Sequence, residues 1–202
     1  MNVKNYLFEI AKNNGLAENG LQVPDCEIDQ KKIEVIMISE VPPKNFEDGF
    51  YSKEKASEYM KSILGLFNAA EVRVNNMKEI INLGIYITTA VKSPKNEYSV
   101  DPDVIKAHLP ILKAELSMFP KLKVIMLMGD VAKKSVNMIT KAETKRNVIP
   151  TGATGRLRQN EYFWGDIRVF PSYIMTGKNL LIEKFKRDCV ADDIRRMREF
   201  VK

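Results

Sequence analysis

Four short runs of apolar residues are the clearest feature of the hydrophobic pattern along this chain. They lie at residues 33–38, 83–87, 122–128 and 167–170, and several are rich in β-branched or aromatic residues. The first and third runs are almost continuously apolar, as expected for strands that are covered on both faces. We therefore predict four β-strands at these positions.

Helical periodicity fills much of the sequence between these runs. Apolar residues from Ala56 to Phe67 recur at helical spacing, with Ser52 as the candidate N-cap. Asp101 followed by Pro102 is typical of a helix start, and we expect Pro110 to begin a further helix, because proline is tolerated in the first turn of a helix and not in its interior. Helices are also predicted over residues 3–13, 130–139 and 180–200. Strands that alternate with helices predict an α/β fold with a parallel sheet and right-handed crossovers.

The ends of the predicted strands are where we expect the chemistry. In an open parallel sheet, ligands bind beyond the carboxyl ends of the strands. Four sequence patches stand there: SEVPP from Ser39, TTAVKS from Thr88, GDVAKK from Gly129 and PSYIMT from Pro171. The loops expected around them cover residues 41–51, 93–101 and 147–165.

Length and composition fit one domain over residues 1–202, since 45% of the residues are hydrophobic. The formal net charge is +6. The segment 133–158 holds seven basic residues and one acid, so it has the same net charge as the whole chain. This segment is either a solvated helix face and loop or a surface that meets the phosphates of a nucleic acid.

The few cysteine and histidine residues exclude several classes of site. Two cysteines cannot form a disulfide framework, and a single histidine, His108, excludes a site that needs two imidazoles. No apolar run reaches the roughly 20 residues that a membrane span needs, so we expect no membrane partner. The first residues also lack the apolar stretch of a secretion signal. Together with the free thiols, this predicts a cytoplasmic protein.

The four strand-end patches, in this order, resemble the motifs of the uracil-DNA glycosylase superfamily. The likeness is greatest to its iron–sulfur-containing branch, whose motifs read like GEAPG, ITNVVKC, a strand followed by LG, and PTYHPS. Here they stand as SEVPP, ITTAVKS, LMGDVAKK and PSYIMT, and the likeness spans about residues 33–197. It implies a three-layer α/β/α fold with a four-stranded parallel sheet. It also implies a DNA-repair hydrolase that binds DNA and flips a damaged base into a pocket. We expect the protein to be a monomer.

The first motif of the resemblance supplies a candidate catalytic residue and candidate stacking rings. Glu40 takes the acidic position, where a carboxylate orients water or stabilises a cationic sugar; the alternative is an ordinary loop acid. Phe50 or Tyr51 lies in the region of the ring that stacks on the base, unless these rings only pack within the loop.

The second and last motifs depart from the family pattern. Thr89 replaces the asparagine that reads the base edge, and Thr88 beside it offers a second hydroxyl. Ile174 replaces the histidine that stabilises the leaving base, and the loss of one such donor typically costs about 100-fold to 1,000-fold in rate. Thr176 and Lys178 follow closely. Three roles are open for these two residues: they supply a hydroxyl and a charge to the site, they contact phosphates, or they form a plain turn before the final helix.

The candidate DNA-binding surface combines Lys133, Lys134, Arg156 and Arg158 with Thr176 and Lys178. The loop over residues 151–156 contains two glycines and Arg156, so it either approaches a phosphate closely or simply connects two elements. It lacks the lysine-plus-hydroxyl ending of a nucleotide-binding P-loop.

The iron–sulfur cluster of the related branch is not expected here. Four cysteine ligands are needed. Ser93 stands at the motif cysteine, His108 stands near the next ligand position, and Cys26 and Cys189 are the thiols of the chain. We predict no metal and no cofactor, and we expect His108 to be a partly buried helix residue.

Three functions remain open from the sequence. The first is a monofunctional DNA glycosylase acting on uracil or another damaged base. The second is a weak or inactive nucleic-acid-binding module on the same fold, because Thr89 and Ile174 replace the best-known base contacts. The third is a hydrolase or transferase acting on a small nucleoside-like molecule, although the lack of a nucleophile elbow argues against a serine hydrolase.

Overall fold

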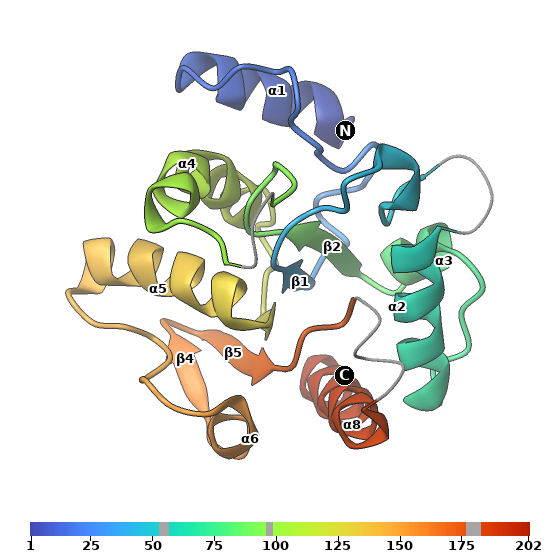
Figure 1. The fold of residues 1–202 in the computed structure, drawn as a ribbon. Helices are drawn as coiled ribbons and strands as arrows, with labels where there is room; N and C mark the ends of the chain where they lie inside the picture. The colour runs from blue at the N-terminus through green and yellow to red at the C-terminus, as the bar shows by residue number, and fades with distance from the viewer. Residues whose placement is uncertain (53–56, 96–98, 177–182) are drawn as a thin grey trace.

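Helices cover both faces of a central β-sheet in the computed structural model of the protein (Figure 1). The structure describes residues 1–52, 57–95, 99–176 and 183–202. The α/β class predicted from the alternating pattern is confirmed.

Over these described ranges, the sheet has five strands in the order β2-β1-β3-β5-β4. Four of them are parallel and match the predicted runs: β1 (Val35–Ser39), β2 (Ile85–Thr89), β3 (Val124–Met128) and β5 (Ile167–Ser172). The fifth strand, β4 (Tyr162–Trp164), pairs antiparallel with β5. The prediction of a purely parallel, four-stranded sheet is therefore wrong in this respect, and the sheet is mixed.

A tight turn at Gly165 explains the extra strand. Gly165 has a φ of 58°, and Trp164 faces Ile167 across the turn, so the chain reverses within two residues. Positive φ is accessible to glycine at little cost, and such turns join antiparallel strands. The region predicted as a loop up to residue 165 thus ends in a short edge strand.

The helices form two layers that bury alternate faces of the strands. One face is covered by α1 (Val3–Asn13), α4 (Pro102–Ser117) and α5 (Asp130–Thr144), and the other by α2 (Glu58–Ala69), α3 (Met77–Asn82) and α8 (Lys184–Val201). Ile36 and Ile125 point into the first layer, and Val35 and Met126 into the second. Two short helices, η1 (Phe46–Asp48) and α6 (Thr154–Leu157), lie in loops.

Two predicted helix boundaries need correction. The N-cap of α2 is Ser57, whose hydroxyl accepts a hydrogen bond from Met60 N–H at 3.0 Å, and not Ser52. Pro110 does not begin a helix, because α4 runs through it from Pro102 to Ser117. Residues on both sides of Pro110 pack in the core, against α1 and α5, and this burial outweighs the one backbone hydrogen bond that proline removes.

Candidate functional site

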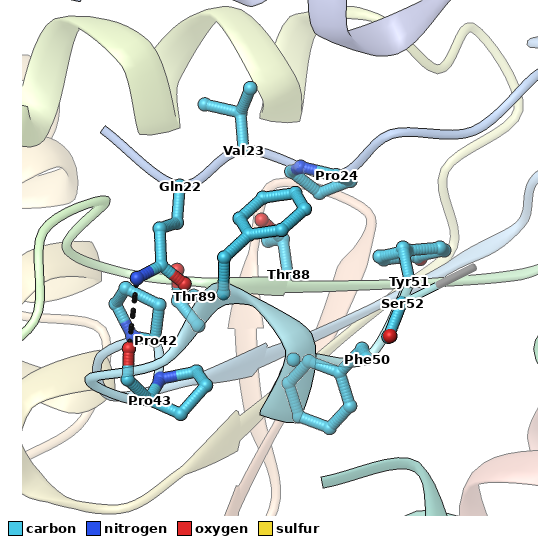
Figure 2. Close-up of a pocket in the computed structure, with 12 residues that line it drawn as sticks. Gln22, Val23, Pro24, Pro42, Pro43, Phe50, Tyr51, Ser52, Thr88 and Thr89 are labelled. Carbon is cyan, nitrogen blue, oxygen red and sulfur yellow. Dashed lines mark hydrogen bonds between the residues drawn. The ribbon is translucent and has the colours of Figure 1, made fainter. Parts of the chain in front are cut away.

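A pocket lies along the carboxyl end of β2, the edge strand of the sheet (Figure 2). We call it the edge pocket. It is lined by Gln22, Val23, Pro24, Pro42, Pro43, Phe46, Gly49, Phe50, Tyr51, Ser52, Thr88 and Thr89. Three chain segments form its walls: the segment following α1, the loop after β1, and the end of β2 itself. The pocket is therefore at the place where the strand-end rule predicts a ligand.

Both predicted stacking aromatics line the edge pocket, but both are held in place by neighbours. Phe50 is only 5% exposed, and its ring packs at 5.1 Å from the ring of Tyr59. The Tyr51 hydroxyl donates to Ile87 O at 2.8 Å and accepts from Ile87 N–H at 3.2 Å. Tyr51 thus pairs with the backbone of Ile87 on the open edge of β2, and burial raises the pKa of its phenol.

Phe46 also lines the edge pocket, although it is not among the residues predicted from the sequence. It begins η1 and is 49% exposed, so its ring has a free face. An exposed ring beside a pocket is the kind of surface on which a planar ligand stacks. The signal available in the sequence was only an aromatic residue in a loop after a strand.

Thr88 and Thr89 lie at the end of β2, as predicted, above a fully buried ion pair. The Lys92 ammonium and the Glu115 carboxylate are 2.5 Å apart and both side chains are 0% exposed. Thr88 donates its hydroxyl proton to Glu115 Oε1 at 2.7 Å and accepts from Lys92 Nζ at 2.7 Å. Tyr86 also donates to Glu115 Oε1, at 2.7 Å. The Thr88 hydroxyl thus gives its proton to the core, and the residue is only 1% exposed, so Thr88 offers no hydroxyl donor to a ligand.

Burial dominates the electrostatics of this network. It lowers the pKa of Lys92, although the adjacent Glu115 carboxylate acts in the opposite direction. It raises the pKa of Tyr86, and the negative charge of Glu115 adds to that shift. Lys92 Nζ also donates to the carbonyl oxygen of Thr89, which fixes the backbone at the pocket.

Glu40, the predicted catalytic carboxylate, directly follows β1, and its side chain contacts the first turn of α5. Its Oε1 accepts a hydrogen bond from Val131 N–H at 3.1 Å, and the side chain is half-buried. A carboxylate at this place satisfies a helix-terminal N–H and interacts favourably with the helix dipole. Glu40 is absent from the lining of the edge pocket. The structure thus gives it a positioning contact, and its catalytic role stays a prediction.

Gly129 makes room for the Glu40 side chain. Gly129 has a φ of 108° and a ψ of 178°, a conformation adopted almost only by glycine. A Cβ atom at Gly129 would lie 2.5 Å from Glu40 Oε1. Glycine at this position therefore permits both the backbone turn and the contact between the first and third motifs.

We expect Gly129→Ala to lower the free energy of unfolding by about 1–3 kcal/mol, because it combines a disfavoured backbone conformation with the displacement of Glu40. Gly15→Ala is the matched control, since Gly15 also has a positive φ, of 72°, and a Cβ atom there would meet no other atom within 4 Å. Urea denaturation of both variants measures the difference. Equal losses would show that the Glu40 contact adds nothing.

The last motif contributes buried groups rather than free ones. Thr176 is 5% exposed and its hydroxyl bonds to the phenol of Tyr59, so it is not available to a phosphate as predicted. Burial raises the pKa of Tyr59, and the Thr176 bond opposes that shift. Ile174 is half-buried and is not among the residues that line the edge pocket. Lys178 lies outside the described residues.

Two of the predicted DNA-binding cations, Arg158 and Lys133, are used inside the protein. Arg158 is 7% exposed and its guanidinium bonds to the carboxylates of Asp192 and Asp193. Lys133 is 8% exposed and bonds to Asp130 at 2.7 Å and to Thr154 at 2.8 Å. The expectation that these two charges face DNA is therefore corrected.

Lys134 and Arg156, by contrast, are exposed. Lys134 lies in the second turn of α5, which begins directly after the carboxyl end of β3, and Arg156 lies in α6. Within the part of the predicted surface that the structure describes, Lys134 and Arg156 are the exposed cations.

Ser93 and His108, which the resemblance places at and near cluster-ligand positions, lie next to each other, but their side chains do not fit an iron–sulfur cluster. Ser93 Oγ lies 3.4 Å from His108 Nε2. His108 lies in α4, as predicted, but it is buried rather than partly buried. Its Nδ1 is 2.8 Å from Val104 O, and burial lowers its pKa. Among the described residues no group of three His, Cys, Asp or Glu side chains is arranged to hold a metal ion. Cys26 and Cys189 are free thiols, and burial raises the pKa of Cys26 to about 12.

Comparisons with known proteins add no assignment. No model of a known protein family matches the chain, and no curated protein sequence matches it either. Within the described residues, no helix is long and apolar enough to span a membrane. What the fold and the site define is an α/β protein with an aromatic-walled pocket at the carboxyl edge of its sheet.

Proposed function

We propose that the protein binds DNA, takes one extruded base into the edge pocket and hydrolyses its N-glycosidic bond. It would act as a monofunctional DNA glycosylase on uracil or another damaged base. The edge pocket is the observation that carries this proposal. Its walls are apolar and aromatic, and its floor is the polar edge of β2, a combination suited to a flat heterocycle with hydrogen-bonding groups on its rim.

Two further contacts support the resemblance on which the proposal draws. Glu40, of the first motif, bonds to Val131 of the third motif, so these two strand ends meet. Ser93, at one position where the related branch has a cysteine, and His108, near the next such position, lie side by side. Both pairs are far apart in the sequence, so their contact is a property of the fold.

Oligonucleotides that each contain one lesion test this function. Purified protein is incubated with single-stranded and double-stranded substrates, and abasic sites are measured after alkaline cleavage. We expect abasic sites with at least one lesion and their loss in Glu40→Gln, which keeps an oxygen for Val131 N–H but removes the charge. Absence of abasic sites with every lesion, beside a working control enzyme, contradicts the catalytic part of the proposal.

A second candidate is a non-catalytic binding module, and specific contacts favour it. The Glu40 carboxylate is engaged with α5, and the Thr88 hydroxyl is bonded into the core. Ile174 has no polar group to offer a leaving base. This candidate predicts selective binding of lesion-containing DNA without release of the base, so the same oligonucleotides separate the two functions.

We expect Phe46→Ala to weaken binding to lesion-containing DNA by about 1–3 kcal/mol, the usual contribution of one base stacked on an aromatic ring. The exposed position of Phe46 makes a large loss of stability unexpected. Fluorescence anisotropy with a labelled oligonucleotide measures the affinity. Phe163→Ala is the control, because Phe163 is equally exposed, at 49%, but lies in β4 at the opposite edge of the sheet. Equal effects of the two changes would argue against stacking at Phe46.

The exposed cations give a separate prediction about salt. The double variant Lys134→Ala/Arg156→Ala should bind DNA more weakly, and the slope of log affinity against log salt should decrease by about 2, one for each lost phosphate contact. Lys31→Ala/Lys32→Ala is the matched control, since these exposed residues precede the amino end of β1. A titration at several salt concentrations measures both slopes. An unchanged slope in the first variant would remove Lys134 and Arg156 from the DNA-binding surface.

A further inference from the structure

We infer that Gln22 reads the edge of the bound base, together with the backbone N–H of Thr89, in place of the asparagine that the second motif lacks. This inference rests on the proposed function and assigns the base-recognising residue within it. Gln22 lies in the segment between α1 and β1, far in sequence from every strand-end motif. Among the residues that line the edge pocket, it is the one with a planar side-chain amide.

Gln22 is held in position by two hydrogen bonds. Its backbone N–H donates to Lys92 O at 2.6 Å, which ties the segment to the end of the second motif. Its side-chain Nε2 donates to Pro43 O at 2.9 Å, the bond drawn in Figure 2. A carbonyl oxygen accepts only, so the amide nitrogen must face Pro43 and the amide oxygen must face away from it. Gln22 Oε1 is thus a preoriented acceptor at the pocket.

The edge of β2 supplies the complementary donor. Ala90 N–H donates to Ser39 O, so the N–H groups of alternate residues in β2 point toward β1. Ile87 and Thr89 have the opposite orientation, and Ile87 indeed bonds to the Tyr51 hydroxyl at the outer edge. The N–H of Thr89 therefore points out from the edge strand, at a residue that lines the pocket.

An acceptor beside a donor selects a particular chemical edge. A lactam, an N–H next to a carbonyl, would donate to Gln22 Oε1 and accept from Thr89 N–H. Uracil and hypoxanthine, the deamination products of cytosine and adenine, both have this edge. Cytosine and adenine instead present a ring-nitrogen lone pair and an amino group. The lone pair would then face the acceptor Gln22 Oε1, and the amino group would face the donor Thr89 N–H, so neither hydrogen bond could form. Unpaired buried polar groups of this kind are the usual origin of strong discrimination.

The test is a binding measurement with bases that cannot be released. Oligonucleotides contain one uracil, cytosine, hypoxanthine or adenine on a 2′-fluorinated sugar, which resists glycosidic cleavage, and their affinities are measured by fluorescence anisotropy. We expect the wild-type protein to prefer uracil to cytosine and hypoxanthine to adenine. Gln22→Ala should reduce both preferences by about 5-fold to 10-fold, the value of one hydrogen bond. Gln22→Lys keeps a donor for Pro43 O without an acceptor, and should lose the preferences equally.

The outcomes separate this inference from the proposed function. If the wild-type protein shows the preferences and both Gln22 variants keep them, Gln22 does not read the base, while the proposed function stands. If the wild-type protein binds none of these oligonucleotides more tightly than an undamaged one, the proposed function fails and the inference fails with it. Thermal unfolding of each variant shows whether the fold is retained. Loss of the preferences in Gln22→Ala alone would assign the effect to the Pro43 contact and overturn the reading role.

Discussion

Replacement of Glu115 by alanine is expected to lower the free energy of unfolding by about 3–5 kcal/mol, as for the removal of one member of a buried ion pair. Glu115 and Lys92 are both 0% exposed. Without the carboxylate, the ammonium group would remain buried with only neutral oxygens of Thr88 and Thr89 as partners. Tyr86 would lose the acceptor of its hydroxyl as well. Urea denaturation followed by circular dichroism measures the loss.

The double variant Lys92→Met/Glu115→Gln is the control for this prediction. Glutamine keeps an oxygen for Tyr86 and Thr88, and methionine removes the charge that would otherwise stay unpaired. Replacing both charges of a buried pair by neutral groups often costs little. We therefore expect the double variant to be more stable than Glu115→Ala. If it is equally unstable, the loss arises from altered packing and not from an unpaired buried charge.

Replacement of Asp193 by alanine is the second large effect, with an expected loss of about 3 kcal/mol. Asp193 is 0% exposed and accepts hydrogen bonds from Arg158 at 3.0 Å and from the Ser172 hydroxyl at 2.7 Å. These bonds connect α8 to α6 and to the end of β5. Burial raises the pKa of the Asp193 carboxyl, while the bonds to Arg158 and Ser172 oppose the shift.

Asp192→Ala is the matched control, because Asp192 also pairs with Arg158, at 2.8 Å, but its side chain is 44% exposed. Ion pairs at the surface contribute about 0–1 kcal/mol. We expect Asp192→Ala to lie in that range and Asp193→Ala well beyond it, with both measured by thermal and urea denaturation. Similar losses for the two would show that burial does not distinguish these carboxylates.

The parallel strands could be predicted because each is a short apolar run, and burial on both faces selects such residues. β4 could not be predicted in the same way. It has only three residues, and one of them, Phe163, is 49% exposed. These residues form a strand because the turn at Gly165 brings them into antiparallel pairing with β5. The helix boundary predicted at Pro110 was wrong because the local propensity of proline disfavours a helix interior. Contacts of α4 with α1 and α5 stabilise the continuous helix in spite of that propensity.

The candidate site was predictable only where its residues follow strands. Thr89 and Tyr51 come together at the end of β2, because parallel strands bring their carboxyl ends to one edge. Gln22 comes from a segment with no periodic pattern, so nothing local marks it. The density of basic residues was visible in the sequence. The carboxylates that bind Arg158, however, belong to Asp192 and Asp193, which follow 34 and 35 residues later, and only the fold shows that these groups meet.

The proposed function requires that a base leaves the DNA stack and enters the edge pocket. The most direct test is the fluorescence of a 2-aminopurine placed next to a target uracil in duplex DNA, because this probe brightens when its neighbour unstacks. We predict a rise in fluorescence on addition of the wild-type protein, and a smaller rise with Phe46→Ala at protein concentrations that saturate both. Saturated binding with no change in fluorescence would contradict the claim.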